Sequence, residues 1–333
     1  MPAMKSHAPL FCMLLCSLRA IDLTPYHKQY IQLVTEDDGY INPYIDRYYT
    51  AGTRIGWVSK EYSYFKCKSA MSWARFVSLQ GKKNRMTRFN IYLTQDMYTP
   101  TLAHRLLTNI VKGDHLYGGW LRLNFGIFQR SAHALEHTSF SIGMVGPASL
   151  AGPTQNLIHT WGHDPKFLGW NTQIKNEFIF EFNYTWIQKL DFYKSRYFSI
   201  DMLPAASFSL GNALTNFNLG ATLRMGYNLE ADFGPNEIHS GFPGGEPYSN
   251  RLAFYVFVGA MGQFQPLDVF VQGNDAQTRG ITQLPYFLYN AQVGVALLYK
   301  GMRFCFSAID LSKTFRDQSR NHNIGSIELD IAF

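Results

Sequence analysis

Three adjacent acidic residues, Glu36, Asp37 and Asp38, could bind a cation or take part in catalysis. They end one alternating segment, and Thr50 belongs to the stretch 46–52 that begins the next. Because Ca²⁺ takes six to eight oxygen ligands and tolerates irregular geometry, carboxylates at a strand end could hold this ion. A solvated acidic turn is the simpler interpretation of the same residues.

A glutamine and a histidine lie four residues apart in a second polar segment. If Pro153 opens a short helix over residues 153–161, Gln155 and His159 fall on one face of it. An imidazole titrates near neutral pH, so His159 is a candidate general base, although a surface histidine is the common alternative. His163 continues the spacing and would allow a zinc pair, but the sequence offers no third ligand.

A third arrangement places His137 and Ser139 on the same face of a predicted strand, because side chains at i and i+2 point the same way. This pair resembles the outer-membrane phospholipase A family, in which a serine and a histidine of the barrel wall act with an asparagine. The residues after the serine are Phe140 and Ser141, not the Asn-Gly of that family. Because of this difference, we interpret the spacing of His137 and Ser139 as a coincidence and not as a catalytic pair.

Composition limits the elements that can carry these residues. The 333-residue chain is 16% aromatic and only 16% charged, against the roughly 25% charged residues of soluble domains. Mean hydropathy is nevertheless −0.15, and no stretch approaches the ~20 apolar residues of a membrane helix. This combination excludes a helical membrane protein and favours strands that alternate lipid-facing with lumen-facing residues.

The net charge of +6 is spread along the chain without a basic run, so no nucleic-acid partner is expected. A basic rim would suit anionic lipid headgroups.

Period-two alternation recurs from the first mature segment to the last residue. Residues 177–186 carry aromatic side chains at every even position, and residues 217–227 alternate apolar with polar. The final segment alternates in the same way and ends on Phe333. Backbone groups in hydrocarbon must all be paired, so we predict an all-β fold, a closed antiparallel transmembrane β-barrel of about twelve strands with extracellular loops and one short helix. It would form one domain over residues 21–333 and be a monomer.

The first 20 residues have the pattern of an export signal: Lys5 and His7 precede an apolar core over residues 8–18, and Ala20 is a plausible cleavage position. After its removal Cys67 and Cys305 remain, and they could pair in an oxidising compartment.

Taken in order, several motifs resemble the lipid A 3-O-deacylase family of bacterial outer-membrane barrels over most of the mature chain. The residues that carry the resemblance are Glu36 to Asp38, Tyr49 to Gly52, Tyr98 to Pro100, Asp114 to Trp120, Gly146 to Ser149, Gln155 to His159, Gly169 to Gln173, Asn176-Glu177, Phe315 to Gln318, and His322.

The resemblance implies a Ca²⁺-dependent hydrolase of the ester that holds the 3′-linked acyloxyacyl chain of lipid A, at the extracellular rim of the barrel. In that family the histidine matching His159 activates water, and the residues matching Gln155 and Thr50 line the site. The acids matching Asp37 and Asp38 help to hold the cation.

Three departures from the family pattern stand out. Glu36 takes the place of an asparagine, where it could add a cation ligand or disturb oxyanion contacts. Asp164 is the candidate for an acid that follows the catalytic histidine, and His115 stands where Lys or Arg is typical. The alternatives are a structural or channel barrel with an open interior, and a serine phospholipase that uses His137 and Ser139.

Overall fold

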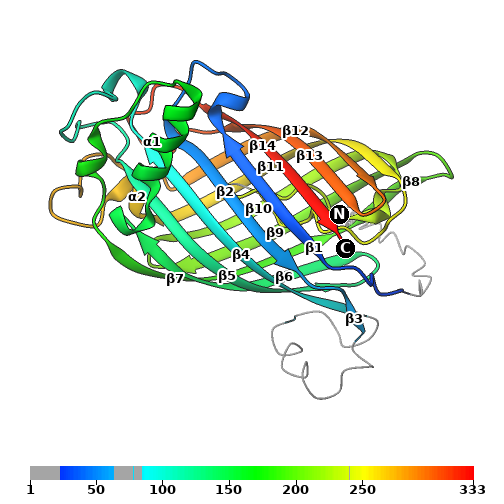
Figure 1. Cartoon of the computed structure of the whole chain (residues 1–333). Coiled ribbons are helices and arrows are strands. Elements are labelled where there is room, and N and C mark those ends of the chain that lie inside the picture. Colours follow the sequence, from blue (N-terminus) through cyan, green and yellow to red (C-terminus); the bar gives the residue numbers. More distant parts are fainter. Residues whose placement is uncertain (1–22, 64–77, 79–84, 240) are drawn as a thin grey trace, which may run out of the picture.

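The computed structural model describes residues 23–63, 78, 85–239 and 241–333. The predicted signal peptide and Cys67 lie outside these residues, whereas Cys305 is a buried free thiol. The wall is built from long strands that bear the labels of Figure 1: β1 (Tyr30–Asp37), β2 (Tyr48–Val58), β4 (Met86–Thr99), β5 (Gly118–Arg130), β6 (Ala134–Val145), β7 (Glu177–Gln188), β9 (Ser199–Gly211), β10 (Leu214–Tyr227), β11 (Ala253–Asp268), β12 (Phe287–Tyr299), β13 (Met302–Leu311) and β14 (His322–Ala332).

Shorter elements decorate the two ends. They are β3 (Tyr62–Ser63), β8 (Leu190–Lys194), α1 (Ala151–Gly162), α2 (Val269–Gln272) and the 3₁₀ turns η1 (Asp38–Tyr40), η3 (Leu102–His104), η4 (Pro147–Ser149), η5 (Gly169–Thr172) and η6 (Leu229–Ala231). Within the described part of the chain, no helix has both the length and the apolar character needed to span a bilayer.

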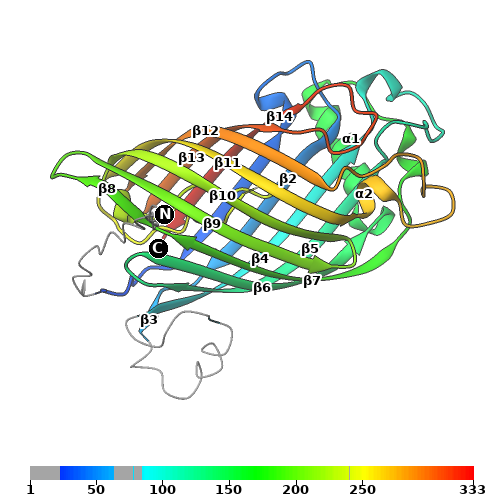
Figure 2. The same cartoon turned by 180° about the vertical axis from the view of Figure 1, so that it is seen from behind.

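The long strands form one closed antiparallel sheet (Figures 1 and 2). Each pairs with its neighbours along the chain, β1 pairs with β14, and β9 pairs with β10 to complete the ring. The predicted barrel of about twelve strands is confirmed. Helices α1 and α2 lie at one end, which we call the rim, and the C-terminus lies at the other (Figure 1).

Burial along the strands is the reverse of that in a soluble protein. Outward positions hold large exposed apolar side chains, among them Leu33, Val258 and Val293. Inward positions hold polar groups, including Arg88 and Arg303, which are completely buried. Exposed apolar residues facing out and paired charges facing in are what a bilayer outside the wall requires.

Part of the chain folds into the lumen and leaves a cavity of about 160 Å³ beside it. The segment 228–252, which we call the plug, follows β10 at the end opposite the rim. It folds back into the lumen, where the strands surround it. Arg54 donates to the Asn236 side chain at 2.8 Å, and Arg88 donates to the Pro247 carbonyl at 3.2 Å. The plug thus occupies the interior that the channel alternative would need to be open.

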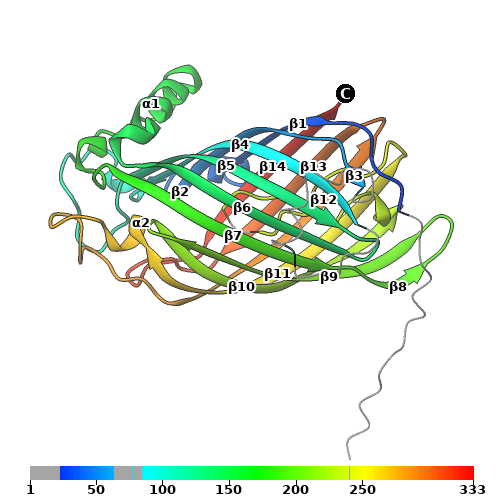
Figure 3. The same ribbon diagram turned by 90° about the horizontal axis from the view of Figure 1, so that it is seen from below.

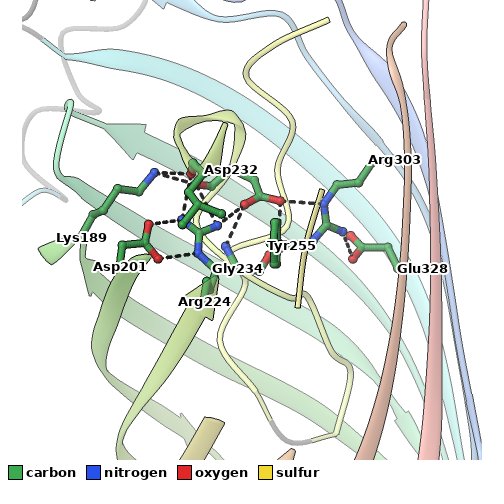
Figure 4. A network of polar contacts seen from close by, with 9 residues as sticks. Lys189, Asp201, Arg224, Asp232, Gly234, Tyr255, Arg303 and Glu328 are labelled. Carbon is green, nitrogen blue, oxygen red and sulfur yellow. Dashed lines mark hydrogen bonds and ion pairs between the residues drawn. The ribbon is translucent and has the colours of Figure 1, made fainter. Parts of the chain in front are cut away.

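A buried ionic network fixes the base of the plug (Figure 4). Asp232 of the plug accepts from Arg224 and, at 3.0 Å, from Arg303. Arg224 also donates to Asp201 at 2.6 and 2.9 Å, and Arg303 pairs with Glu328. Both guanidinium groups are therefore neutralised inside the lumen.

Candidate active site on the outer face of the rim

A cleft of about 490 Å³ opens where the rim ends of β1, β2 and β4 meet helix α1. Its floor is a row of outward-facing partners, in which Asp37 pairs with Ala51 and Ala51 pairs with Met97. Helix α1 stands outside the wall above these strands (Figure 3). The cleft is therefore on the lipid-facing side of the barrel and not in its lumen.

Helix α1 presents Gln155 and His159 to the cleft. The predicted helix over residues 153–161 is confirmed, although it begins at Ala151, after Leu150 in a left-handed conformation with φ of 60°. Gly152 allows close packing on Trp170, because a Cβ at this position would lie 2.9 Å from the indole ring. The i and i+4 spacing then places both polar side chains on the buried face.

The orientation of the His159 ring is set by two contacts. Its Nδ1 lies 2.6 Å from the carbonyl oxygen of Pro165, and because a carbonyl can only accept, Nδ1 carries the hydrogen. In the neutral ring Nε2 is then the basic atom, and it lies 3.3 Å from Oδ2 of Asp46.

Several groups around His159 change its pKa. Burial lowers the pKa of His159, but the hydrogen bonds to Asp46 and Pro165 and the charges of Asp46 and Asp164 raise it by more, so that the net shift is upward from 6.5. The protonated form is thus stabilised next to Asp46, as a general base needs once it has taken a proton.

Asp46 is itself held by threonines of the rim. The Thr50 hydroxyl donates to Oδ1 of Asp46 at 2.9 Å. The hydroxyls of Thr50 and Thr99 are 2.6 Å apart, so Thr99 donates to Thr50. Thr50 also lines the cleft, and its hydrogen bond orients Asp46.

The side-chain amide of Gln155 has a hydrogen-bonded oxygen and an unpaired nitrogen. Its Oε1 accepts from the Trp170 indole at 2.8 Å, which fixes the amide orientation. Its Nε2 is buried and has no hydrogen-bond partner among the described residues. A fixed, unpaired donor in a cleft is suited to bind an oxygen that becomes negatively charged.

Asp37, Asp38 and Asp164 also line the cleft. Burial raises the pKa of Asp38 well above its ordinary value, and the charges of Asp46 and Asp37 raise it further. Asp37 interacts electrostatically with Asp46, His159 and Asp164. In the described part of the chain, however, no three His, Cys, Asp or Glu side chains converge tightly enough to form a ready-made metal site.

Glu36 is not part of this cleft, which corrects its assignment as a catalytic residue and metal ligand. Alternation turns it inward, away from Asp37. In the lumen its carboxylate accepts from the Tyr49 hydroxyl at 2.8 Å and from the backbone N–H groups of Ile238 and His239 at 2.7 and 3.0 Å. Glu36 therefore holds the tip of the plug.

The phospholipase pair also faces the lumen. His137 hydrogen-bonds to Asn90 at 3.1 Å, and Ser139 accepts from Asn124 at 3.0 Å. Neither contact joins the histidine to the serine, and both side chains are enclosed by the wall and away from lipid. The structure gives this alternative no support.

His163 does not continue the active face of α1. It adopts a left-handed conformation with φ of 59° and caps the helix. His115 is buried against the ring of Tyr98, and its Nδ1 lies 2.8 Å from the Leu116 carbonyl. Neither residue joins His159 in the cleft.

Asp46 and Trp170 have roles in the cleft that the sequence alone does not reveal. Both lie inside motifs that were recognised, Asp46 four residues before Thr50 and Trp170 in the segment 169–173. An acid just before a strand that carries a site threonine was the available signal for Asp46. Nothing in the pattern indicated that the Trp170 indole would fix Gln155.

A closed antiparallel barrel with an apolar exterior defines a transmembrane β-barrel of the outer-membrane type. The family model described as outer membrane protein LpxR matches residues 9–333. The chain therefore belongs to the LpxR family, the lipid A 3-O-deacylase family that its motifs resemble, and its location is the outer membrane.

A comparison with solved structures finds one with the same fold. LpxR from Salmonella typhimurium aligns with a TM-score of 0.74 and 18% identity, covering 91% of this chain and 100% of that one. The β-domain of the Bordetella autotransporter BrkA (TM-score 0.45, 10% identity, 92% and 99% coverage) is less similar. So is an outer membrane channel from Pseudomonas putida F1 (TM-score 0.42, 7% identity, 94% and 97% coverage). No curated protein matches the chain.

Proposed function

We propose that this protein hydrolyses the ester of the 3′-linked acyloxyacyl chain of lipid A, with His159 as the general base and Ca²⁺ as a cofactor. Family membership supports an outer-membrane lipid A deacylase. The observation that carries the finer proposal is the position of the His159 Nε2 and Gln155 Nε2 atoms. Both belong to a cleft on the lipid-facing side of the rim.

The cleft lies where a glycolipid would present its ester. Below the cleft floor, the wall carries Leu33, Ile55 and Leu93 on neighbouring strands, all facing lipid. On α1, Leu157 and Trp161 are exposed, Trp161 by 73%, and Ile158, which lines the cleft, is about half exposed. Because indole side chains favour the membrane interface, α1 would lie at headgroup level with the cleft beneath it.

In the proposed reaction the Nε2 atoms of His159 and Gln155 each have one role. Nε2 of His159 takes a proton from water, whose oxygen attacks the ester carbonyl carbon. The Gln155 N–H donates to the oxyanion that forms. Collapse breaks the bond between the acyl carbon and the 3′ oxygen, and the proton on Nε2 passes to that oxygen. The products are the free acid and a 3′-hydroxyl glycolipid.

Asp37, Asp38 and Asp164 would hold Ca²⁺. Their carboxylate oxygens are the donors that this ion prefers, and the mutual repulsion of Asp37, Asp38 and Asp46 is what a bound cation would relieve. When bound, Ca²⁺ would polarise the ester carbonyl. Thr50 would act through Asp46 and not on the substrate.

The test is hydrolysis of purified lipid A by the full-length barrel, followed by mass spectrometry of the products. We expect loss of the 3′ acyloxyacyl group, dependence on added Ca²⁺, and a rate roughly 10²–10⁴-fold lower for His159→Ala. Ser139→Ala is the matched control, because its hydroxyl faces the lumen. Unchanged hydrolysis by His159→Ala, or equal loss in both variants, would reject the mechanism.

A further inference from the structure

A second hollow lies on the lipid-facing wall, over β11 to β14. It measures about 380 Å³, and most of its lining is apolar, with Ile41, Val258, Val293 and Ala308 among the residues. Gln292, Asp310 and Asn323 also line it. Val258 and Val293 are about half exposed, as outward residues of a membrane wall are. We call this hollow the wall groove.

The wall groove and the active-site cleft lie on the same row of paired residues. Asp37, in the cleft, pairs with Gly325 of β14. Gly325 pairs with Ala308, and Ala308 pairs with Val293. Partners on such a row point to the same side of the sheet, so the two hollows are neighbours on the outer face.

Small residues create the groove, and η1 separates it from the cleft. A Cβ at Gly325 would lie 2.7 Å from the Cβ of Tyr40 and 3.5 Å from Cδ1 of Ile41, so this segment packs directly on Gly325. Asp37 and Asp38 then lie on the cleft side of η1, whereas Ile41 lines the groove. Ala308 and Ala291 leave the groove open beyond it.

We propose that the wall groove holds a second acyl chain of the same glycolipid whose ester is hydrolysed in the cleft. The inference rests on the proposed function and specifies how its substrate is positioned. A wall inside a bilayer can be covered only by hydrocarbon, and lipid A carries several acyl chains on one headgroup. A headgroup lying over η1 would direct one chain to each side of it.

The groove would favour binding of the acyl chain by its shape and not by its hydrophobicity, because the surrounding lipid tails are as apolar as the groove. Van der Waals contact with Ala308, Ala291 and Val293 would fix the position of the headgroup and hence of the ester. We therefore expect an effect of roughly three- to tenfold on kcat/KM, smaller than that of losing the base.

Ala308→Phe fills the groove, and Ala206→Phe is the matched control. Ala206 also faces lipid, but on β9, which β10, β11 and β12 separate from β13. On lipid A, Ala308→Phe should lower kcat/KM by roughly three- to tenfold, mainly through KM, and Ala206→Phe should not. A substrate analogue with the ester-linked chain as its sole acyl group should be hydrolysed equally by both. Equal values for the two variants on lipid A would overturn the proposal.

A second measurement separates this inference from the proposed activity. In a His159→Ala background, native mass spectrometry from detergent measures how much lipid A each barrel retains. Ala308→Phe, or the milder Ala291→Leu if the first does not fold, should reduce retention, and Ala206→Phe should not. If the groove variants retain as much lipid A as the barrel without them, the proposed binding of an acyl chain in the groove is rejected, even if the wild type is active. Reduced retention supports it even if the wild type does not hydrolyse the ester.

Discussion

Nε2 of His159 lies 3.3 Å from Oδ2 of Asp46, in a contact that joins helix α1 to the segment before β2. The two residues are far apart in sequence, and the contact places the imidazole next to a carboxylate that can stabilise its protonated form. Asp46 is in turn oriented by Thr50. The pH dependence of the reaction should therefore reflect the pKa of His159 next to Asp46.

A base must be neutral to take a proton, so activity should fall as pH falls through the pKa of His159. Burial lowers that pKa, but Asp46, the Pro165 carbonyl and Asp164 raise it more, so the midpoint of the acid limb of kcat/KM should lie above 6.5. Asp46→Asn removes a charge that raises the pKa, and should move the midpoint to lower pH. A profile that does not move would show that Asp46 does not act on His159.

Gln155→Glu replaces the unpaired N–H donor by a carboxylate that cannot stabilise an oxyanion. We expect kcat to fall roughly 10²–10³-fold with a smaller change in KM, as for other oxyanion donors. Trp170→Phe keeps the donor but removes the indole that orients it, so its kcat should fall less. If Gln155→Glu changed only KM, the amide would bind the ground state instead.

Calcium dependence should be sensitive to the cleft acids and insensitive to Glu36. Asp37→Asn should raise the Ca²⁺ concentration needed for half-maximal hydrolysis of lipid A, because one carboxylate ligand is lost. Glu36→Gln is the matched control, since Glu36 binds the plug in the lumen. An equal shift in both variants, or in neither, would remove Asp37 from the cation site.

The plug network should contribute strongly to stability. Arg224→Met leaves Asp201 buried without its guanidinium partner and removes one of the two guanidinium partners of Asp232, and breaking a buried pair in this way costs about 3–5 kcal/mol. We expect the free energy of unfolding in lipid vesicles to fall by about that amount in a urea titration. Lys194→Met, which breaks an exposed pair with Glu230, should change it by less than about 1 kcal/mol.

Local patterns were sufficient to predict the barrel. Alternation at period two fixes which residues of a strand share a face, and a membrane requires every strand edge to be paired. The helix that carries Gln155 and His159 could also be predicted, because the i and i+4 relation is a property of one short segment. These features need no knowledge of distant contacts.

Within the acidic triplet, alternation was also enough to separate Glu36 from Asp37, but adjacency in the sequence suggested a single cluster. The structure shows that the two point to opposite sides of the wall, one to the plug and one to the cleft. Nothing in segment 228–252 indicated that it would fold into the lumen, because its anchors come from distant strands, among them β1, β2 and β13.

The sequence by itself determined the architecture and the chemistry available, since strand periodicity and residue type are local properties. Only the tertiary structure decided which groups meet: the carboxylate of Asp46 with the imidazole of His159, the indole of Trp170 with the amide of Gln155, and Gly325 with Tyr40. Those contacts depend on the register in which strands pair around the ring and on how the loops pack across the rim. A one-residue shift in register would turn Asp37 inward and remove the site.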